Sequence, residues 1–120
     1  MNAKILVIDD ESVTRRLVTH ALKKVDVETI GAADAAEALR LAQAQDFALA
    51  LVDINLPDMD GFTLIKHLKA IPHMNQVPML VFTARNNADD RMLATESGAM
   101  GFFYKPFSTQ ELRDLVTAHL

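Results

Sequence analysis

Short apolar runs recur along the chain at a steady interval, with polar segments between them. Each run is rich in β-branched side chains and short enough for a single strand. The runs lie at residues 5–8, 27–30, 47–52, 79–82 and 102–104. The pattern therefore predicts five strands.

The segments between these runs carry apolar residues at helical spacing. In the first segment, Val13 and Leu17 recur with Val18 and Leu22, so all four are expected to face the core. The last segment repeats the spacing in residues 112–119. The chain thus alternates strand and helix five times.

Signals for helix ends agree with this alternation. Ser108 begins a capping-box pattern, the stretch from Asp34 resembles one, and Asn87 precedes a polar first turn. Gly98 stands where a left-handed residue would end the fourth helix.

The predicted strands lack the alternation of a sheet with one wet face, as in the stretch ALALV at residues 48–52. Both faces must therefore be covered by helices. Because each helix must return the chain to the same edge of the sheet, the strands run parallel. The prediction is an α/β fold, a doubly wound five-stranded parallel sheet in a (βα)5 three-layer sandwich.

Composition narrows the class of protein. A chain of 120 residues makes one domain, 1–120, with no room for a second core. The lack of cysteine excludes disulfides, thiolate zinc sites and cysteine nucleophiles, and suits a reducing compartment. A net charge of -4 argues against nucleic-acid binding, and no apolar run reaches the ~18 residues of a membrane span. A cytoplasmic protein without direct nucleic-acid or membrane contact is expected.

Charged and hydroxyl residues stand where the predicted strands end. Asp9 and Asp10 follow the first strand, Asp53 the third, Thr83 the fourth and Lys105 the fifth. Ligands of open parallel sheets bind at these ends. Three clustered carboxylates call for a cation, and Mg²⁺ prefers such oxygen ligands, whereas zinc would want His or Cys.

A carboxylate beside a metal, a hydroxyl and an ammonium can accept a phosphoryl group as an acyl phosphate. Asp53 is the central candidate for this role. Lys105 would add a positive contact, and the Thr83 hydroxyl could donate a hydrogen bond to the new phosphoryl group.

Four stretches carry a family resemblance: ILVIDDE at residues 5–11, LVDINLPDMDG at 51–61, FTA at 82–84 and KPF at 105–107. Over its whole length the sequence resembles the receiver domain of two-component response regulators, the CheY-like family. The resemblance implies a flavodoxin-like sheet of order 2-1-3-4-5. It also implies phosphorylation of Asp53 by a sensor histidine kinase or a histidine phosphotransfer protein.

The resemblance further implies roles for single residues. Asp10 and Asp53 would bind Mg²⁺ directly, with the backbone carbonyl of Asn55, and Asp9 would act through a metal-bound water. Mn²⁺ could substitute for Mg²⁺. Lys105 would contact the acceptor and the phosphoryl group, and its bond to Pro106 would be cis.

The same resemblance implies a switch. Thr83 would move toward the phosphoryl group and the Phe102 ring would turn inward, changing the face formed by the fourth helix, fifth strand and fifth helix. Asn55 and Arg85 would tune the phosphoryl lifetime. The partner of that face would be an effector protein or an output domain that lies outside residues 1–120, and the chain would be a monomer or a weak phosphorylation-dependent dimer.

Other residues are expected to have only structural roles. The four histidines do not have the spacing of metal ligands, so no metal site is assigned to them. The methionines, among them Met92 and Met100, are expected to fill the core or turns. The exposed side of the first helix is expected to carry Arg15, Arg16, Lys23 and Lys24. The family resemblance also implies that the partner kinase docks near that helix.

Three alternative functions remain to be weighed. A haloacid-dehalogenase-like phosphatase would need Asp-x-Asp on the first strand and a cap domain, whereas this chain has Asp9 followed by Asp10. A flavin-binding electron carrier would need a phosphate-binding loop where the acidic residues stand. An interaction domain that has lost phosphorylation would not need all five site positions. We therefore expect a phosphoacceptor that catalyses only its own phosphoryl transfer and autodephosphorylation, rather than an enzyme.

Overall fold

Five parallel strands form the central sheet of the computed structural model, which describes residues 3–84 and 89–120. The strands are β1 (Ala3–Ile8), β2 (Val27–Ala32), β3 (Leu49–Val52), β4 (Met79–Thr83) and β5 (Gly101–Tyr104). Their order is β2-β1-β3-β4-β5, and every neighbouring pair is parallel. This confirms the predicted topology. The strand ends differ from the predicted ranges by one or two residues.

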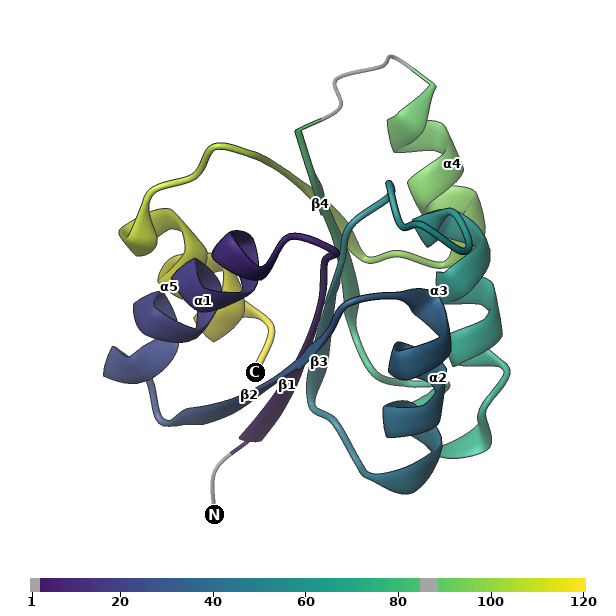
Figure 1. Cartoon of the computed structure of the whole chain (residues 1–120), viewed down its shortest axis with the longest axis horizontal. Coiled ribbons are helices and arrows are strands. Elements are labelled where there is room, and N and C mark those ends of the chain that lie inside the picture. The colour runs from purple at the N-terminus through teal and green to yellow at the C-terminus, as the bar shows by residue number, and fades with distance from the viewer. Residues whose placement is uncertain (1–2, 85–88) are drawn as a thin grey trace.

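The helices cover both faces of the sheet. They are α1 (Ser12–Ala21), α2 (Ala35–Ala44), α3 (Gly61–Lys69), α4 (Asp90–Ser97) and α5 (Thr109–Ala118), with short 3-10 turns η1 (Leu22–Lys24) and η2 (Pro72–Met74). α1 and α5 lie on one face, while α2, α3 and α4 lie on the other (Figure 1). The result is the predicted three-layer sandwich.

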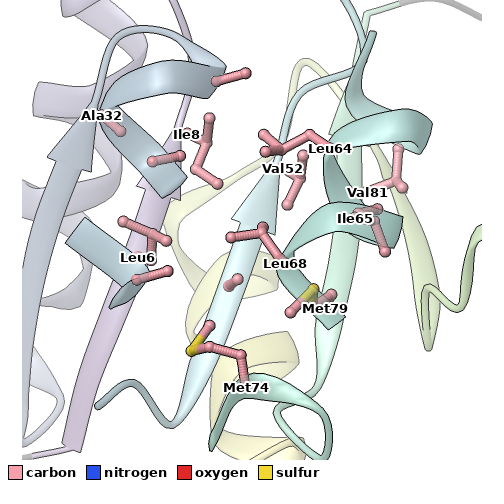
Figure 2. Packing of buried hydrophobic residues seen from close by; sticks show 14 of the residues in the cluster. Leu6, Ile8, Ala32, Val52, Leu64, Ile65, Leu68, Met74, Met79 and Val81 are labelled. Carbon is pink, nitrogen blue, oxygen red and sulfur yellow. The ribbon is translucent and has the colours of Figure 1, made fainter. Parts of the chain in front are cut away.

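Two hydrophobic clusters hold the layers together, one on each face. Alternate residues of a strand point to opposite faces. Ile5 and Val7 of β1 therefore join the cluster under α1 and α5, whereas Leu6 and Ile8 join the one under α2, α3 and α4. The second cluster continues through Val52 of β3 and the α3 residues (Figure 2). Burial on both faces explains why the buried stretches of the central strands, residues 5–8, 49–52 and 79–82, have no polar positions.

Local signals place the helix ends as expected. Ser108 and Glu111 form a reciprocal capping box at α5, and Gly98 ends α4 with φ 101°. The Asp34 side chain accepts a hydrogen bond from the Glu37 amide, so it caps α2. The predicted start at Asn87 lies outside the described residues.

Some predicted core positions are wrong. Val13 and Leu17 are 63% and 55% exposed, because α1 packs on the sheet through Val18 and Ala21, continued by Leu22 of η1, and these two side chains lie to one side of that stripe. Met92 on α4 is likewise exposed rather than filling the core, whereas Met100 lies exposed in the turn before β5, one of the two places expected for the methionines. The helices of the described ranges include none with the length and apolar character that crossing a membrane requires.

Candidate functional site

The predicted site residues gather at the carboxyl end of the sheet, where the strand order reverses between β1 and β3. Asp9 and Asp10 follow β1 directly, and Asp53 follows β3. Residues Ile5 to Ile8 of β1 pair in register with Leu49 to Val52 of β3, so the two strands end side by side. The parallel pairing therefore brings together carboxylates that are more than forty residues apart in the sequence.

The three carboxylates form one compact cluster. One oxygen from each of Asp9, Asp10 and Asp53 lies within 4.8 Å of the others. Asp9 is fully buried and Asp53 is 5% exposed, whereas Asp10 is open to solvent. Carboxylates this close repel one another, and burial of two of them strengthens the repulsion. The open side at Asp10 gives a cation and its waters a path in.

Lys105 supplies one compensating charge from the end of β5. Its Nζ forms an ion pair with Asp9 and lies 3.4 Å from Oδ2 of Asp53. The ammonium group also lies 4.8 Å from the centroid of the Phe82 ring. The Lys105–Pro106 peptide bond is cis, as the resemblance implied. One ammonium between three carboxylates leaves the cluster with excess negative charge, which suits a divalent cation with oxygen ligands.

The pKa of the Asp53 carboxyl group is affected by its burial and by the neighbouring charges. Desolvation raises the pKa of its carboxyl group above the ordinary value, and the nearby Asp9 charge adds to that effect. Lys105 and a hydrogen bond from the Asn55 amide, 3.4 Å from Oδ1, act in the opposite direction and lower the pKa. Burial dominates, so Asp53 is a carboxylate whose negative charge is poorly solvated in the metal-free protein.

The loop from β3 to α3 is closed tightly behind Asp53. The Gly61 amide donates to the Ile54 carbonyl at 2.8 Å, and Asn55 forms an isolated antiparallel bridge with Asp60. A Cβ at Gly61 would lie 2.3 Å from the Asp53 carbonyl oxygen, so α3 can begin this close only with glycine there. Asp60 then caps α3 by accepting from the Thr63 amide.

The remaining predicted residues lie around this cluster. Thr83 is fully buried at the end of β4, and its carbonyl accepts a hydrogen bond from the Lys105 amide at 2.8 Å. Phe102 is half-buried on the α4 side of β5, apart from the carboxylates, with its ring centroid 4.9 Å from that of Tyr104. Arg85 lies outside the described residues.

Two contacts at the site were missed by sequence reasoning. Arg15, expected on the exposed side of α1, is half-buried, and its Nη1 donates to the Asp9 carbonyl at 2.6 Å. Asp58, to which the sequence pattern gave no individual role, accepts hydrogen bonds from the first amides of α2. The partners of Asp58 are 22 and 23 residues away, so no local pattern could have found them.

Comparisons with known proteins agree with this geometry. Residues 5–117 match the family model of the response regulator receiver domain. The chain is 38% identical over 117 residues to the transcriptional regulatory protein HprR of Escherichia coli, covering 98% of this chain and 51% of that protein. It is 33% identical over 120 residues to sporulation initiation phosphotransferase F of Bacillus subtilis, covering 100% and 95%. The chain thus spans about half the length of HprR but nearly all of the phosphotransferase.

Solved structures show the same fold. The chemotaxis response regulator CheY4 of Vibrio cholerae superposes with a TM-score of 0.95 at 31% identity, with both chains covered completely. The receiver domain of a Pseudomonas aeruginosa sensor histidine kinase, solved with a magnesium ion coordinated in its active site cleft, matches with a TM-score of 0.90 at 25% identity, covering 99% of this chain and 98% of that one. On this family match and these full-length likenesses, the chain belongs to the response regulator receiver domains of two-component systems, a family whose general function is phosphorylation-dependent signalling.

Proposed function

We propose that Asp53 accepts a phosphoryl group from a phosphohistidine of a sensor histidine kinase or of a histidine phosphotransfer protein. One observation carries the proposal: a buried carboxylate at a strand end has an ammonium 3.4 Å away and two further carboxylates within 4.8 Å. Such a carboxylate can act as a nucleophile, and the cations that its negative neighbours require would also neutralise the charge of an incoming phosphoryl group. The family's phosphorylation-dependent signalling supports this assignment.

The same cluster would hold one Mg²⁺ ion, with Mn²⁺ as a substitute. Its donors fit the ion, since all three are carboxylates whose oxygens lie within 4.8 Å and whose charge Lys105 does not balance. Asp10 and Asp53 would be direct ligands together with the backbone carbonyl of Asn55, and Asp9 would act through a bound water. When bound, the ion supplies positive charge to the oxygens of the transferring phosphoryl group.

The residues of the chain perform the transfer as follows. An oxygen of Asp53 forms a bond to phosphorus while the P–N bond of the phosphohistidine breaks, and the imidazole leaves with the electron pair and takes up a proton. Lys105 stays beside Asp53 and stabilises the acyl phosphate, and the Thr83 hydroxyl donates to a phosphoryl oxygen. Attack of water on phosphorus later releases inorganic phosphate and restores Asp53. The protein is a phosphoacceptor that catalyses only its own phosphorylation and dephosphorylation.

The output of this reaction is assigned to α4, β5 and α5. Phe102 borders a cavity of about 150 Å³ between α4 and β5, lined also by Ala94 and Met100, which leaves room for the ring to change position when Thr83 moves. The outer surface carries the exposed side chains of Met92, Leu93 and Met100. An effector protein or an output domain would bind there, and the chain itself would be a monomer or a weak phosphorylation-dependent dimer.

The phosphodonor would dock beside Lys105. Leu17 and Thr14 of α1 line a cavity of about 190 Å³ with Lys105, Pro106 and Phe107. The surface continues over exposed apolar side chains of α1, and a donor seated there would present its imidazole to Asp53. Transfer would take place in the cytoplasm, since a chain without cysteine is compatible with a reducing compartment.

Intact mass after incubation with acetyl phosphate and Mg²⁺ tests the proposal. We expect a single phosphoryl adduct on the wild-type protein and none on Asp53→Asn or in EDTA. Asp46→Asn, which changes an exposed aspartate before β3, is the matched control and should be phosphorylated normally. An adduct that persists in Asp53→Asn would overturn the assignment of the acceptor. No adduct from acetyl phosphate or from a phosphorylated histidine protein would overturn the phosphoacceptor function.

A further inference from the structure

The loop of residues 54–60 carries Asn55, whose backbone carbonyl is a proposed metal ligand, and it is fastened to the fold at three places. At its start, the Asp53 amide donates to the Ile8 carbonyl at 2.9 Å. At its end, the Gly61 amide donates to the Ile54 carbonyl at 2.8 Å. The third contact is made by the side chain of Asp58, which hydrogen-bonds to α2.

Asp58 binds the N-terminus of α2 with both carboxylate oxygens. Oδ1 accepts from the Ala35 amide at 2.9 Å and Oδ2 from the Ala36 amide at 3.0 Å. These are the first two residues of α2, whose amides have no partner within the helix. The helix dipole also favours a negative charge at this end. In accord with this, the two amide hydrogen bonds hold the pKa of Asp58 below its ordinary value.

The contact does more than cap a helix. α2 already has its own capping residue, since Asp34 accepts from the Glu37 amide at 2.8 Å. Asp58 is exposed and belongs to no hydrophobic cluster, so its contribution is the bond between two elements rather than packing. That bond ties the middle of the loop to a helix that is itself anchored on the sheet through Ala35, Ala38 and Ala42.

We propose that Asp58 is a positioning residue for the metal site: by fixing the loop of residues 54–60 on α2, it holds the Asn55 carbonyl where a divalent cation can use it. The inference rests on the proposed metal role of the cluster. Mg²⁺ requires near-ideal octahedral geometry, so a carbonyl on a loose loop would be ordered only when the ion binds. Ordering the loop in advance through Asp58 lowers that entropy cost.

The test is calorimetric titration of the unphosphorylated protein with MgCl₂. We expect Asp58→Ala to raise the Mg²⁺ dissociation constant by about 10-fold, the low end of the range for groups that orient metal ligands. Asp58→Asn keeps one side-chain oxygen for one of the two amides, so its dissociation constant should fall between those of Asp58→Ala and the wild type. Melting temperature without metal is recorded for each variant.

Asp34→Ala is the matched control. It removes the same charge and a capping hydrogen bond at the same helix end, but its partner, the Glu37 amide, lies within α2. It should lower the melting temperature as Asp58→Ala does and leave the Mg²⁺ affinity at the wild-type value. This split separates a positioning role from general loss of helix stability or of negative charge.

The outcomes distinguish this inference from the function on which it rests. If wild-type protein binds no Mg²⁺, the proposed metal site fails, and the role of Asp58 fails with it. If wild-type protein binds Mg²⁺ and Asp58→Ala binds it equally well, only the positioning role is overturned. Equal weakening in Asp34→Ala and Asp58→Ala would also overturn it, since the effect would then not depend on the loop contact.

Discussion

Asp9, Asp53 and Lys105 occupy one small volume at the end of the sheet, and removing a negative or a positive charge there has opposite consequences. The Asp9 side chain is completely buried and the Lys105 side chain is 13% exposed, so water screens their interaction weakly. Asp53 adds a second buried negative charge to the same ammonium group. The arrangement favours cation binding at the expense of stability in the metal-free protein.

Asp53→Asn should therefore make the metal-free protein more stable at neutral pH. The pKa of Asp53 is raised by burial, so between the ordinary value and the raised one the folded protein holds more protons than the unfolded chain. Stability of the wild type then falls as pH rises through that interval, and the variant lacks this fall. Urea unfolding in EDTA across acid and neutral pH measures it. A variant no more stable at neutral pH would contradict the predicted charge strain.

The contrast is Lys105→Met, which keeps an unbranched side chain one atom shorter than lysine and removes its charge. It leaves the fully buried Asp9 carboxylate without its ammonium partner, so the free energy of unfolding should drop by about 2 kcal/mol or more in EDTA. Saturating Mg²⁺ should recover part of this loss. A Lys105→Met protein as stable as the wild type would show that solvent already compensates Asp9.

At the scale of elements, the approach of α3 to β3 sets the position of Asp53. The Gly61 amide bonds the Ile54 carbonyl, and no side chain fits between the start of α3 and the backbone that carries Asp53. The same loop is fixed at its middle by Asp58 on α2. The candidate metal loop thus depends on contacts among three elements.

Gly61→Ala should disturb phosphorylation through the backbone. The new Cβ would lie 2.3 Å from the Asp53 carbonyl oxygen and 2.8 Å from the Ile54 Cα, so α3 or Asp53 must shift. We expect the rate of adduct formation with acetyl phosphate to fall by about 10-fold or more, measured by intact mass. Gly101→Ala is the control, because its Cβ would meet only the Cδ2 atom of the Leu80 side chain, 2.9 Å away, and not the backbone that carries Asp53. An unchanged rate in Gly61→Ala would mean that α3 yields without moving the acceptor.

At the scale of the whole molecule, cation binding and folding are linked. Asp9, Asp10 and Asp53 come together only when β1 and β3 pair, so the unfolded chain lacks the site. Mg²⁺ at ten times its dissociation constant should then add about 1.4 kcal/mol to the free energy of unfolding, which corresponds to a few degrees in melting temperature. Thermal unfolding over a range of MgCl₂ concentrations measures this.

Asp10→Ala removes the exposed carboxylate of the cluster and should abolish that rise while leaving the fold intact. Asp46→Ala changes an exposed aspartate outside the cluster and should retain it. A rise of equal size in Asp10→Ala would place the stabilising cation elsewhere on the protein.

Much of the architecture followed from local patterns. Continuously apolar runs between helical segments predicted a parallel sheet covered on both faces, because a strand without polar positions must be buried on both sides. Ser108 and Gly98 marked helix ends through bonds to near neighbours, which local sequence contains. Val13 and Leu17 were predicted wrongly, since apolar spacing shows that a helix has a buried side but not how wide that side is.

The candidate site divides in the same way. The sequence by itself determined which residue types follow each strand and that they share one edge of the sheet, because carboxyl ends of parallel strands meet there. The strand order that lets Asp9, Asp53 and Lys105 meet followed from the family resemblance and is confirmed by the structure. Only the tertiary structure decided that Arg15 bonds the Asp9 carbonyl and that Asp58 bonds the start of α2. Those contacts depend on the distances and angles at which α1 and α2 pack on the sheet. The packing of whole elements involves residues far apart in the sequence, so no local pattern predicts it.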